Sequence, residues 1–238
     1  MKTAALIITT ATLAAGAIAD ITTLQDNRYA YATVTLNNGP GTPQTEDRIE
    51  RFYSNPFQTL NESFDLSITN PAVGSASAST AYESSLSTTR FSSSASISSS
   101  ITTLPTGLVA GALAGFSNRV EFTLDDTTTF QIAGFLSGSG SIGGSILLFA
   151  NITDDGQSSE SLFTQSAFNT TRQLNTFLTL EAGDYSFTTL SFTSSAALEY
   201  NQSVSSLAAH EITITVIPTP ATTALLFLTS PLLTRRRR

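Results

Sequence analysis

The stretch RYAYATVTL, residues 28–36, alternates strictly between two kinds of side chain. Tyr and Thr occupy the odd positions, whereas Ala, Val and Leu occupy the even positions from Ala30 to Leu36. A period of two residues is the signature of a β-strand with one buried face, and the following Asn37-Asn38-Gly39-Pro40 is typical of a turn. The stretch therefore predicts a strand that ends at about residue 36.

The same alternation recurs along the chain, with no convincing helix between its occurrences. It is found in residues 64–69, 120–125, 130–134, 177–181, 185–189 and 212–216, and residues 146–150 form a short continuous apolar run. Nine or so short strands separated by Gly, Asn and Asp turns predict an all-β fold, an antiparallel β-sandwich of the jelly-roll-like kind. The 15 Phe residues supply enough bulk to fill the space between two sheets without Trp.

Several connecting segments carry specific expectations. Residues 181–184 (EAGD) predict a hairpin turn, and the Gly-rich residues 138–144 predict a flexible hairpin loop. Residues 106–115 fit either one helical turn or a Gly-rich loop, and residues 196–208 remain undecided. The Ser-rich, low-complexity residues 75–100 fit either a disordered linker or strands with Ser-covered outer faces. We favour strands, because residues 94–101 alternate and the β body needs partners there.

The N-terminus has the pattern of an export signal. Lys2 is followed by an uncharged apolar run, residues 4–13, and then by small residues that end in Ala17-Ile18-Ala19 before Asp20. This order predicts a signal helix over residues 1–19, with Ala17 and Ala19 fitting the cleavage rule and Asp20 beginning the mature chain. The alternative, a buried N-terminal helix, is disfavoured because the run ends on a cleavage pattern rather than a cap. Residues 20–216 are then the β-sandwich domain.

Charge is distributed unevenly along the chain. Lys2 and the last four residues hold five of the 11 basic side chains, whereas all 18 acidic residues lie from Asp20 onward. The middle of the chain therefore carries 6 basic against 18 acidic residues, a formal charge of −12. A body this acidic repels phosphate backbones, so no nucleic-acid partner is expected. An acidic, Ser- and Thr-rich surface suits a protein that stays hydrated outside the cell.

The C-terminus, residues 217–238, has three parts in a fixed order. Pro218-Thr219-Pro220 breaks regular structure, residues 221–233 are apolar apart from Thr, Ser and one Pro, and the chain ends in Arg235, Arg236, Arg237 and Arg238. An arginine cluster resists translocation, so an exported chain would halt with this segment inserted as a hydrophobic helix. An ordinary C-terminal tail anchor is the alternative.

This ending resembles the PEP-CTERM sorting signal, in a variant with Thr219 between the two prolines. The resemblance implies recognition by an exosortase, a membrane-embedded peptidase, after delivery by the Sec export machinery. It also implies transient insertion into the inner membrane, then release or anchoring at the cell surface or outside the cell. Proteins with this signal often accompany exopolysaccharide production, which makes exopolysaccharide a possible partner.

Composition removes most catalytic chemistry and predicts no cofactor. Cys and Trp are absent and His210 is the single imidazole, beside Glu211 on the opposite face of an expected strand. Asp125-Asp126 and Asp154-Asp155 offer oxygen ligands for Ca²⁺, but solvated turns explain them better, so no metal site is predicted.

We therefore predict no catalytic residue and a non-enzymatic surface or matrix protein with a structural role in an exopolysaccharide layer. The first alternative is a carbohydrate-binding module, in which tyrosines replace Trp as stacking platforms; the candidates are Tyr29, Tyr31, Tyr53, Tyr82, Tyr185 and Tyr200. The second alternative is a secreted hydrolase with a carboxylate pair such as Glu121 and Glu181.

Overall fold

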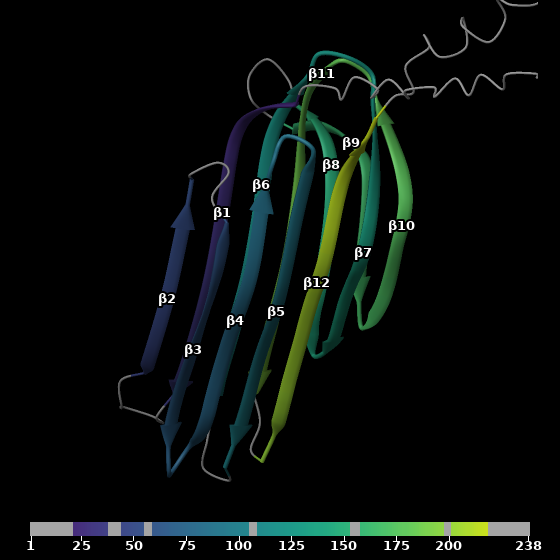
Figure 1. Ribbon diagram of the computed structural model, residues 1–238. Helices are drawn as coiled ribbons and strands as arrows, with labels where there is room; N and C mark the ends of the chain where they lie inside the picture. The colour runs from purple at the N-terminus through teal and green to yellow at the C-terminus, as the bar shows by residue number, and fades with distance from the viewer. Residues whose placement is uncertain are drawn as a thin grey trace, which may run out of the picture.

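Two antiparallel six-stranded sheets face each other in the computed structural model, and the twelve strands of its described residues make up the all-β sandwich (Figure 1). The structure describes residues 21–37, 44–54, 59–104, 109–152, 158–197 and 201–218. Within these ranges no helix is present, and the strands are 9 to 17 residues long. The predicted all-β sandwich is confirmed, with more and longer strands than the sequence indicated.

Sheet A has the strand order β2-β1-β6-β11-β8-β9, and sheet B has the order β10-β7-β12-β5-β4-β3. The strands of sheet A are β1 (Ile21–Asn37), β2 (Thr45–Tyr53), β6 (Val109–Leu124), β8 (Ile142–Ile152), β9 (Ser158–Phe168) and β11 (Gly183–Ala197). The strands of sheet B are β3 (Leu60–Asn70), β4 (Gly74–Leu86), β5 (Arg90–Thr103), β7 (Thr128–Gly140), β10 (Thr170–Leu180) and β12 (Ser203–Ile217).

The last eight strands pair as nested antiparallel partners. Strand β8 pairs with β9, β7 with β10, β6 with β11, and β5 with β12. Strands β5–β12 therefore form one long hairpin. It is folded so that its successive strand pairs alternate between the two sheets. The β1–β2 hairpin extends sheet A beside β6, and the β3–β4 hairpin extends sheet B beside β5.

The Ser-rich segment lies in two central strands, which confirms the strand interpretation of residues 75–100. Strands β4 and β5 pair with each other over their full length, and their residues alternate between buried and more exposed positions. Residues 109–115, expected as a loop or helical turn, instead begin β6. Small side chains such as those of Ala110, Ala112 and Ala114 carry little apolar signal in the sequence, yet all three are buried in the core.

Two predicted hairpins connect the sheets instead of joining neighbouring strands. Residues 181–184 do lie at a turn, but β10 belongs to sheet B and β11 to sheet A. Residues 138–144 contain the ends of β7 and β8, which also lie in different sheets. A Cβ atom on Gly138 would lie 2.1 Å from the Gly143 carbonyl oxygen. The glycines therefore allow close packing of two backbones at a tight corner rather than a flexible loop.

The core between the sheets is divided into two apolar clusters by a layer of polar side chains. On β6, Phe116 belongs to one cluster and Val120 to the other, and the buried Asn118 lies between them. On β5, Ser93 separates Phe91 from Ala95 in the same way. We call this layer the buried polar belt; it consists of Asp26, Arg28, Ser93, Asn118, Thr189, Ser191 and His210, each buried.

The two terminal segments lie almost wholly outside the described residues. Residues 1–20 and 219–238, and with them the expected signal helix and hydrophobic C-terminal helix, are not described. Strand β12 ends at Ile217, and Pro218 follows as an exposed residue. Within the described ranges, no helical segment has the length and apolar character that a membrane span requires.

Candidate functional site

A row of four polar side chains, ending beside Phe135, crosses the outer face of sheet B. The cross-strand register places Asn61 beside Glu83, Glu83 beside Ser94, Ser94 beside Glu211, and Glu211 beside Phe135. These residues point away from the core, because their neighbours along each strand are the buried ones. The row therefore brings together, on five strands, residues that lie far apart in the sequence.

A hollow of about 590 Å³ lies along this row. Register places the small residues Ala81, Ser96 and Ala209 side by side in the adjacent row, and they line the hollow beside Glu83 and Glu211. Short side chains leave space where their neighbours extend outward, which explains the depression. Its volume is within the range of about 300–1,000 Å³ that is usual for small-molecule sites.

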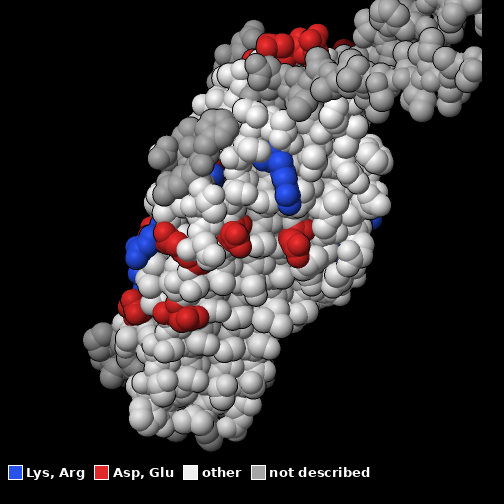
Figure 2. Space-filling model, in the orientation of Figure 1, with Lys and Arg blue, Asp and Glu red and all other residues white. Residues whose placement is uncertain are grey.

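A second hollow of about 350 Å³ shares Glu83, Ser94 and Glu211 with the first and adds Arg90. Figure 2, in the orientation that turns β4, β5 and β12 toward the viewer, shows a row of acidic side chains across the middle of this face and a basic side chain near it. Among the described residues, Arg90 makes no ion pair with Glu83 or Glu211. These three charged groups remain available to a ligand. We refer to the two hollows together as the glutamate hollow.

The glutamate hollow can accept hydrogen bonds but is poorly suited to acid catalysis. Glu83 and Glu211 are separated by the single strand β5, so their Cα atoms lie about 10 Å apart. Both side chains are exposed. A general acid in a glycosidase is typically a carboxyl group held in an apolar, buried environment, whereas these two carboxylates face solvent. The arrangement favours binding of hydroxyl groups or cations over bond cleavage.

His210 lies in the buried polar belt, and Glu211 points to the outer face, as predicted for neighbours on one strand. The His210 Nδ1 atom is 2.7 Å from Ser191 Oγ, and its Nε2 atom is 2.9 Å from Ser93 Oγ. Complete burial of the imidazole lowers its pKa to about 3. The ring is therefore neutral under physiological conditions, and it lies between the sheets rather than on a surface that a substrate can reach.

A pair of opposite charges completes the buried polar belt. Asp26 and Arg28 face the core from β1 and form a two-pronged ion pair, with one Nε–Oδ1 distance of 2.9 Å. Both side chains are almost fully buried. The two charges stabilise each other where neither would be stable alone.

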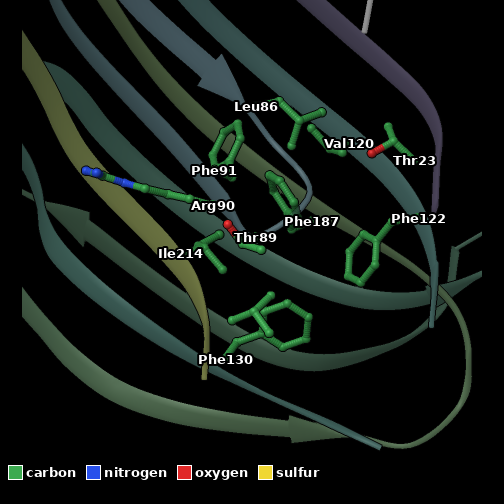
Figure 3. Close-up of a pocket in the computed structure, with 11 residues that line it drawn as sticks. Thr23, Leu86, Thr89, Arg90, Phe91, Val120, Phe122, Phe130, Phe187 and Ile214 are labelled. Carbon is green, nitrogen blue, oxygen red and sulfur yellow. The ribbon is translucent and has the colours of Figure 1, made fainter. Parts of the chain in front are cut away.

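An apolar cavity at one end of the core is too small for a ligand. Its volume is about 30 Å³, and its lining includes Leu86, Phe91, Phe122, Phe130 and Phe187. Figure 3 shows these side chains converging from several strands of the two sheets. The space has room for about one water molecule and offers it little polar contact.

The remaining candidates from the sequence are dispersed. Asp125 and Asp126 are exposed in the β6–β7 turn, whereas Asp154 and Asp155 lie outside the described residues. Glu121 pairs with Arg119 at 2.9 Å on sheet A, and Glu181 lies in the β10–β11 turn. Among the described residues, no group of three or more His, Cys, Asp and Glu side chains is arranged to hold a metal ion.

The predicted tyrosine platforms lie in different environments. Tyr82 and Tyr185 are buried, and the Tyr53 and Tyr82 hydroxyls both donate to Glu62. Tyr29 and Tyr31 lie together on the outer face of sheet A, and Tyr200 lies outside the described residues.

Of the processing and sorting residues, only Pro218 is described. Ala17, Ala19, Asp20, Thr219, Pro220 and the cluster Arg235, Arg236, Arg237 and Arg238 lie outside the described residues.

Sequence reasoning did not identify the glutamate hollow. Glu83 and Glu211 each stand at an outward position of an alternating stretch, and this was the one signal available. Their proximity depends on β12 pairing with β5, which no local pattern specifies.

No protein-family model and no curated protein matches the sequence. Among solved structures, the chain is similar to one described as the structure of infectious bursal disease virus Gt strain, at 10% sequence identity. The match covers 87% of this chain and 60% of that chain, with a TM-score of 0.23. A likeness at this level carries no argument about function.

Proposed function

We propose that the chain is an exported cell-surface or extracellular-matrix protein that associates with exopolysaccharide and catalyses no reaction. The observation that carries the proposal is the outer face of sheet B, where serine hydroxyls bond one another across β4 and β5. The pairs are Ser77–Ser100, Ser79–Ser98 and Ser85–Ser92, each with an Oγ–Oγ distance of 2.7 Å. Hydroxyl groups both donate and accept, so such a face is suited to hydrated sugar polymers.

The non-enzymatic part of the proposal is supported by where the reactive groups lie. The single imidazole, that of His210, is buried in the core. The two carboxylates of the glutamate hollow, Glu83 and Glu211, are exposed. Neither environment supplies the tuned acid and base that hydrolysis requires.

Export and sorting are supported by the two terminal segments. We propose that residues 1–19 direct Sec-dependent export and that residues 217–238 insert transiently into the inner membrane as a PEP-CTERM-like signal. An exosortase-type peptidase would then recognise Pro218-Thr219-Pro220 and release or anchor the protein outside the cell. Both segments are proposed to be helical in their apolar parts, although residues 221–233 are fewer than the roughly 20 residues of a usual membrane-spanning helix.

We infer a jelly-roll-like topology for strands β5–β12. Support comes from the nested pairing of β8 with β9, β7 with β10, β6 with β11 and β5 with β12, because folding one long hairpin over itself gives two Greek keys in two sheets.

The sorting proposal is tested by changing Arg235, Arg236, Arg237 and Arg238 to Ser together and fractionating the producing cells. The variant should leave the membrane fraction, since the positive charges that resist translocation are gone. Arg51→Ser, which alters an exposed arginine of β2, is the matched control and should fractionate as the wild type does. A four-Ser variant that stays in the membrane fraction at unchanged mass overturns the stop-transfer role.

A carbohydrate-binding module with a discrete ligand is the second candidate, and the glutamate hollow favours it. Glu83→Gln and Glu211→Gln should each weaken a specific hit on a glycan array, because carboxylates are strong acceptors for sugar hydroxyls. Glu181→Gln, in an exposed turn, is the control and should bind as the wild type does. Broad, weak binding that neither substitution changes would favour the structural role instead.

A further inference from the structure

On the outer face of sheet A, one row that crosses all six strands combines aromatic side chains with glycines. Register places Glu50 beside Tyr31, Tyr31 beside Gly115, Gly115 beside Phe192, Phe192 beside Gly144, and Gly144 beside Phe168. The row thus alternates between rings and glycines. Five interstrand steps of about 4.8 Å give it a length of about 24 Å.

Rings in this row lie over the glycines instead of standing away from the sheet. A Cβ atom on Gly115 would lie 2.5 Å from Cε1 of Tyr31, and one on Gly144 would lie 2.3 Å from Cε1 of Phe168. Side chains on a sheet normally stand perpendicular to it, so the missing Cβ atoms are what allow the rings to lie down. The glycines therefore shape the surface without contributing side chains of their own.

Two further rings lie beside the row at its β1–β2 end. Tyr29 stacks on Tyr31 with a centroid distance of 5.4 Å and on Phe52 with a centroid distance of 4.4 Å. At the other end, Phe168 and Phe192 meet edge to face at 5.9 Å. We call the set Tyr29, Tyr31, Phe52, Phe168 and Phe192 the aromatic strip. Its most exposed members are Phe52 at 73% and Phe168 at 47%.

A polar group borders the strip at the β2 edge. The Tyr29 hydroxyl donates to Glu50 at 2.6 Å, and Arg48 forms an ion pair with the same carboxylate. The strip thus combines ring faces with hydrogen-bonding groups at one end. Sugar rings have the same division, with apolar C–H faces and hydroxyl edges.

We propose that the aromatic strip binds an extended polysaccharide chain, with sugar faces on the rings and sugar hydroxyls at the Arg48–Glu50 edge. This rests on the proposed association with exopolysaccharide and names a surface for it, on the sheet opposite the glutamate hollow. The strip is long and narrow, and three of its five rings are partly buried. A stable protein interface buries about 800 Å² on each partner, so a chain one sugar wide fits the strip better than a second copy does.

The test is co-sedimentation of the full-length chain, purified in mild detergent, with insoluble β-linked glycans such as cellulose and chitin. The double variant Phe52→Ser with Phe168→Ser should bind at least about tenfold more weakly, because two exposed stacking rings are lost. The control Phe177→Ser removes a ring that is 63% exposed on sheet B and should leave binding unchanged.

Gly144→Ala tests the geometry without removing a ring. The added methyl would force Phe168 away from the sheet, so binding should fall while the fold is retained, because the three atoms nearest to the methyl all belong to this side-chain ring. Light scattering of each variant checks the oligomeric state in parallel.

The proposal is overturned if the wild type does not sediment with either glycan, or if Phe177→Ser weakens binding as much as the double variant does. It is also overturned if the double variant converts a dimer to a monomer, which would make a second copy the occupant. Co-sedimentation uses purified protein, so a negative result says nothing about export and sorting. Those proposals are tested separately by cell fractionation.

Discussion

His210 Nδ1 and Ser191 Oγ lie 2.7 Å apart, and this contact links β12 of sheet B to β11 of sheet A through the middle of the core. Ser93 reaches the other ring nitrogen at 2.9 Å. Whichever nitrogen carries the proton donates to its serine, and the other accepts, so one neutral imidazole satisfies both contacts. The ring therefore serves the packing of the sandwich.

Acid should weaken the fold through His210. The pKa of His210 is about 3 in the folded chain, whereas the ordinary value of 6.5 applies to the unfolded chain. Between these two pH values the unfolded chain binds a proton that the folded chain excludes. The stability that depends on a neutral His210 ring is fully present above pH 6.5 and is lost as pH falls toward 3. Between pH 7 and pH 5 the free energy of unfolding should fall by about 2 kcal/mol, measured by urea denaturation. His210→Gln should remove this dependence; an equal slope in that variant would contradict the assignment.

Ser191→Ala should destabilise the fold by about 1–3 kcal/mol, because it leaves Nδ1 of the buried His210 ring without its partner. Ser100→Ala removes a hydroxyl from the exposed outer pair of sheet B and should change stability by less than about 0.5 kcal/mol. Thermal unfolding of the two variants compares them directly. Equal melting temperatures would show that the buried contact adds no stability.

The ion pair of Asp26 and Arg28 should matter most when only one member is changed. Asp26→Asn or Arg28→Met should cost about 3–5 kcal/mol, since each leaves its partner as a buried group that has lost its counter-charge. The double variant Asp26→Leu with Arg28→Met should be more stable than either single variant. Chemical denaturation of the three proteins tests this, and simple additivity of the two losses would refute it.

Gly134→Ala should be strongly destabilising. Gly134 has a φ of 131°, and a Cβ atom there would lie 1.8 Å from the Glu211 carbonyl oxygen on the neighbouring strand. Backbone strain of this kind costs about 1–3 kcal/mol, and the clash adds to it. Gly111→Ala is the matched control, because its nearest contact is 4.0 Å away, and it should be nearly neutral. Comparable unfolding midpoints for the two variants would contradict the geometry.

Local pattern predicted many of the strands, but not β2, β9 or the pairing of the strands. Alternation in residues 28–36 and 94–101 correctly predicted strands, and the opposite orientations expected for His210 and Glu211 are also confirmed. The turn at residues 181–184 was also located correctly, yet it joins two sheets rather than two neighbours. A turn sequence fixes where the chain reverses, whereas the sheet that receives the next strand depends on contacts from the whole chain.

Both candidate surfaces depend on that long-range register. The glutamate hollow exists because β12 pairs with β5, and the aromatic strip exists because β11 lies between β6 and β8. Gly115 and Gly144, which lie under rings of the strip, could not be recognised from the sequence. A glycine within a strand pattern can equally mark a bulge, a bend or a turn. Their role becomes visible when Tyr31 and Phe168 are seen to lie over them.

If this sandwich is the body of an exported, sorted surface protein, the intact mass of the protein recovered from the cell exterior will show it. We expect a chain that begins at Asp20 and is found outside the cell. Recovery of the protein inside the cell, at the mass of the uncleaved chain from Met1 to Arg238, would contradict it.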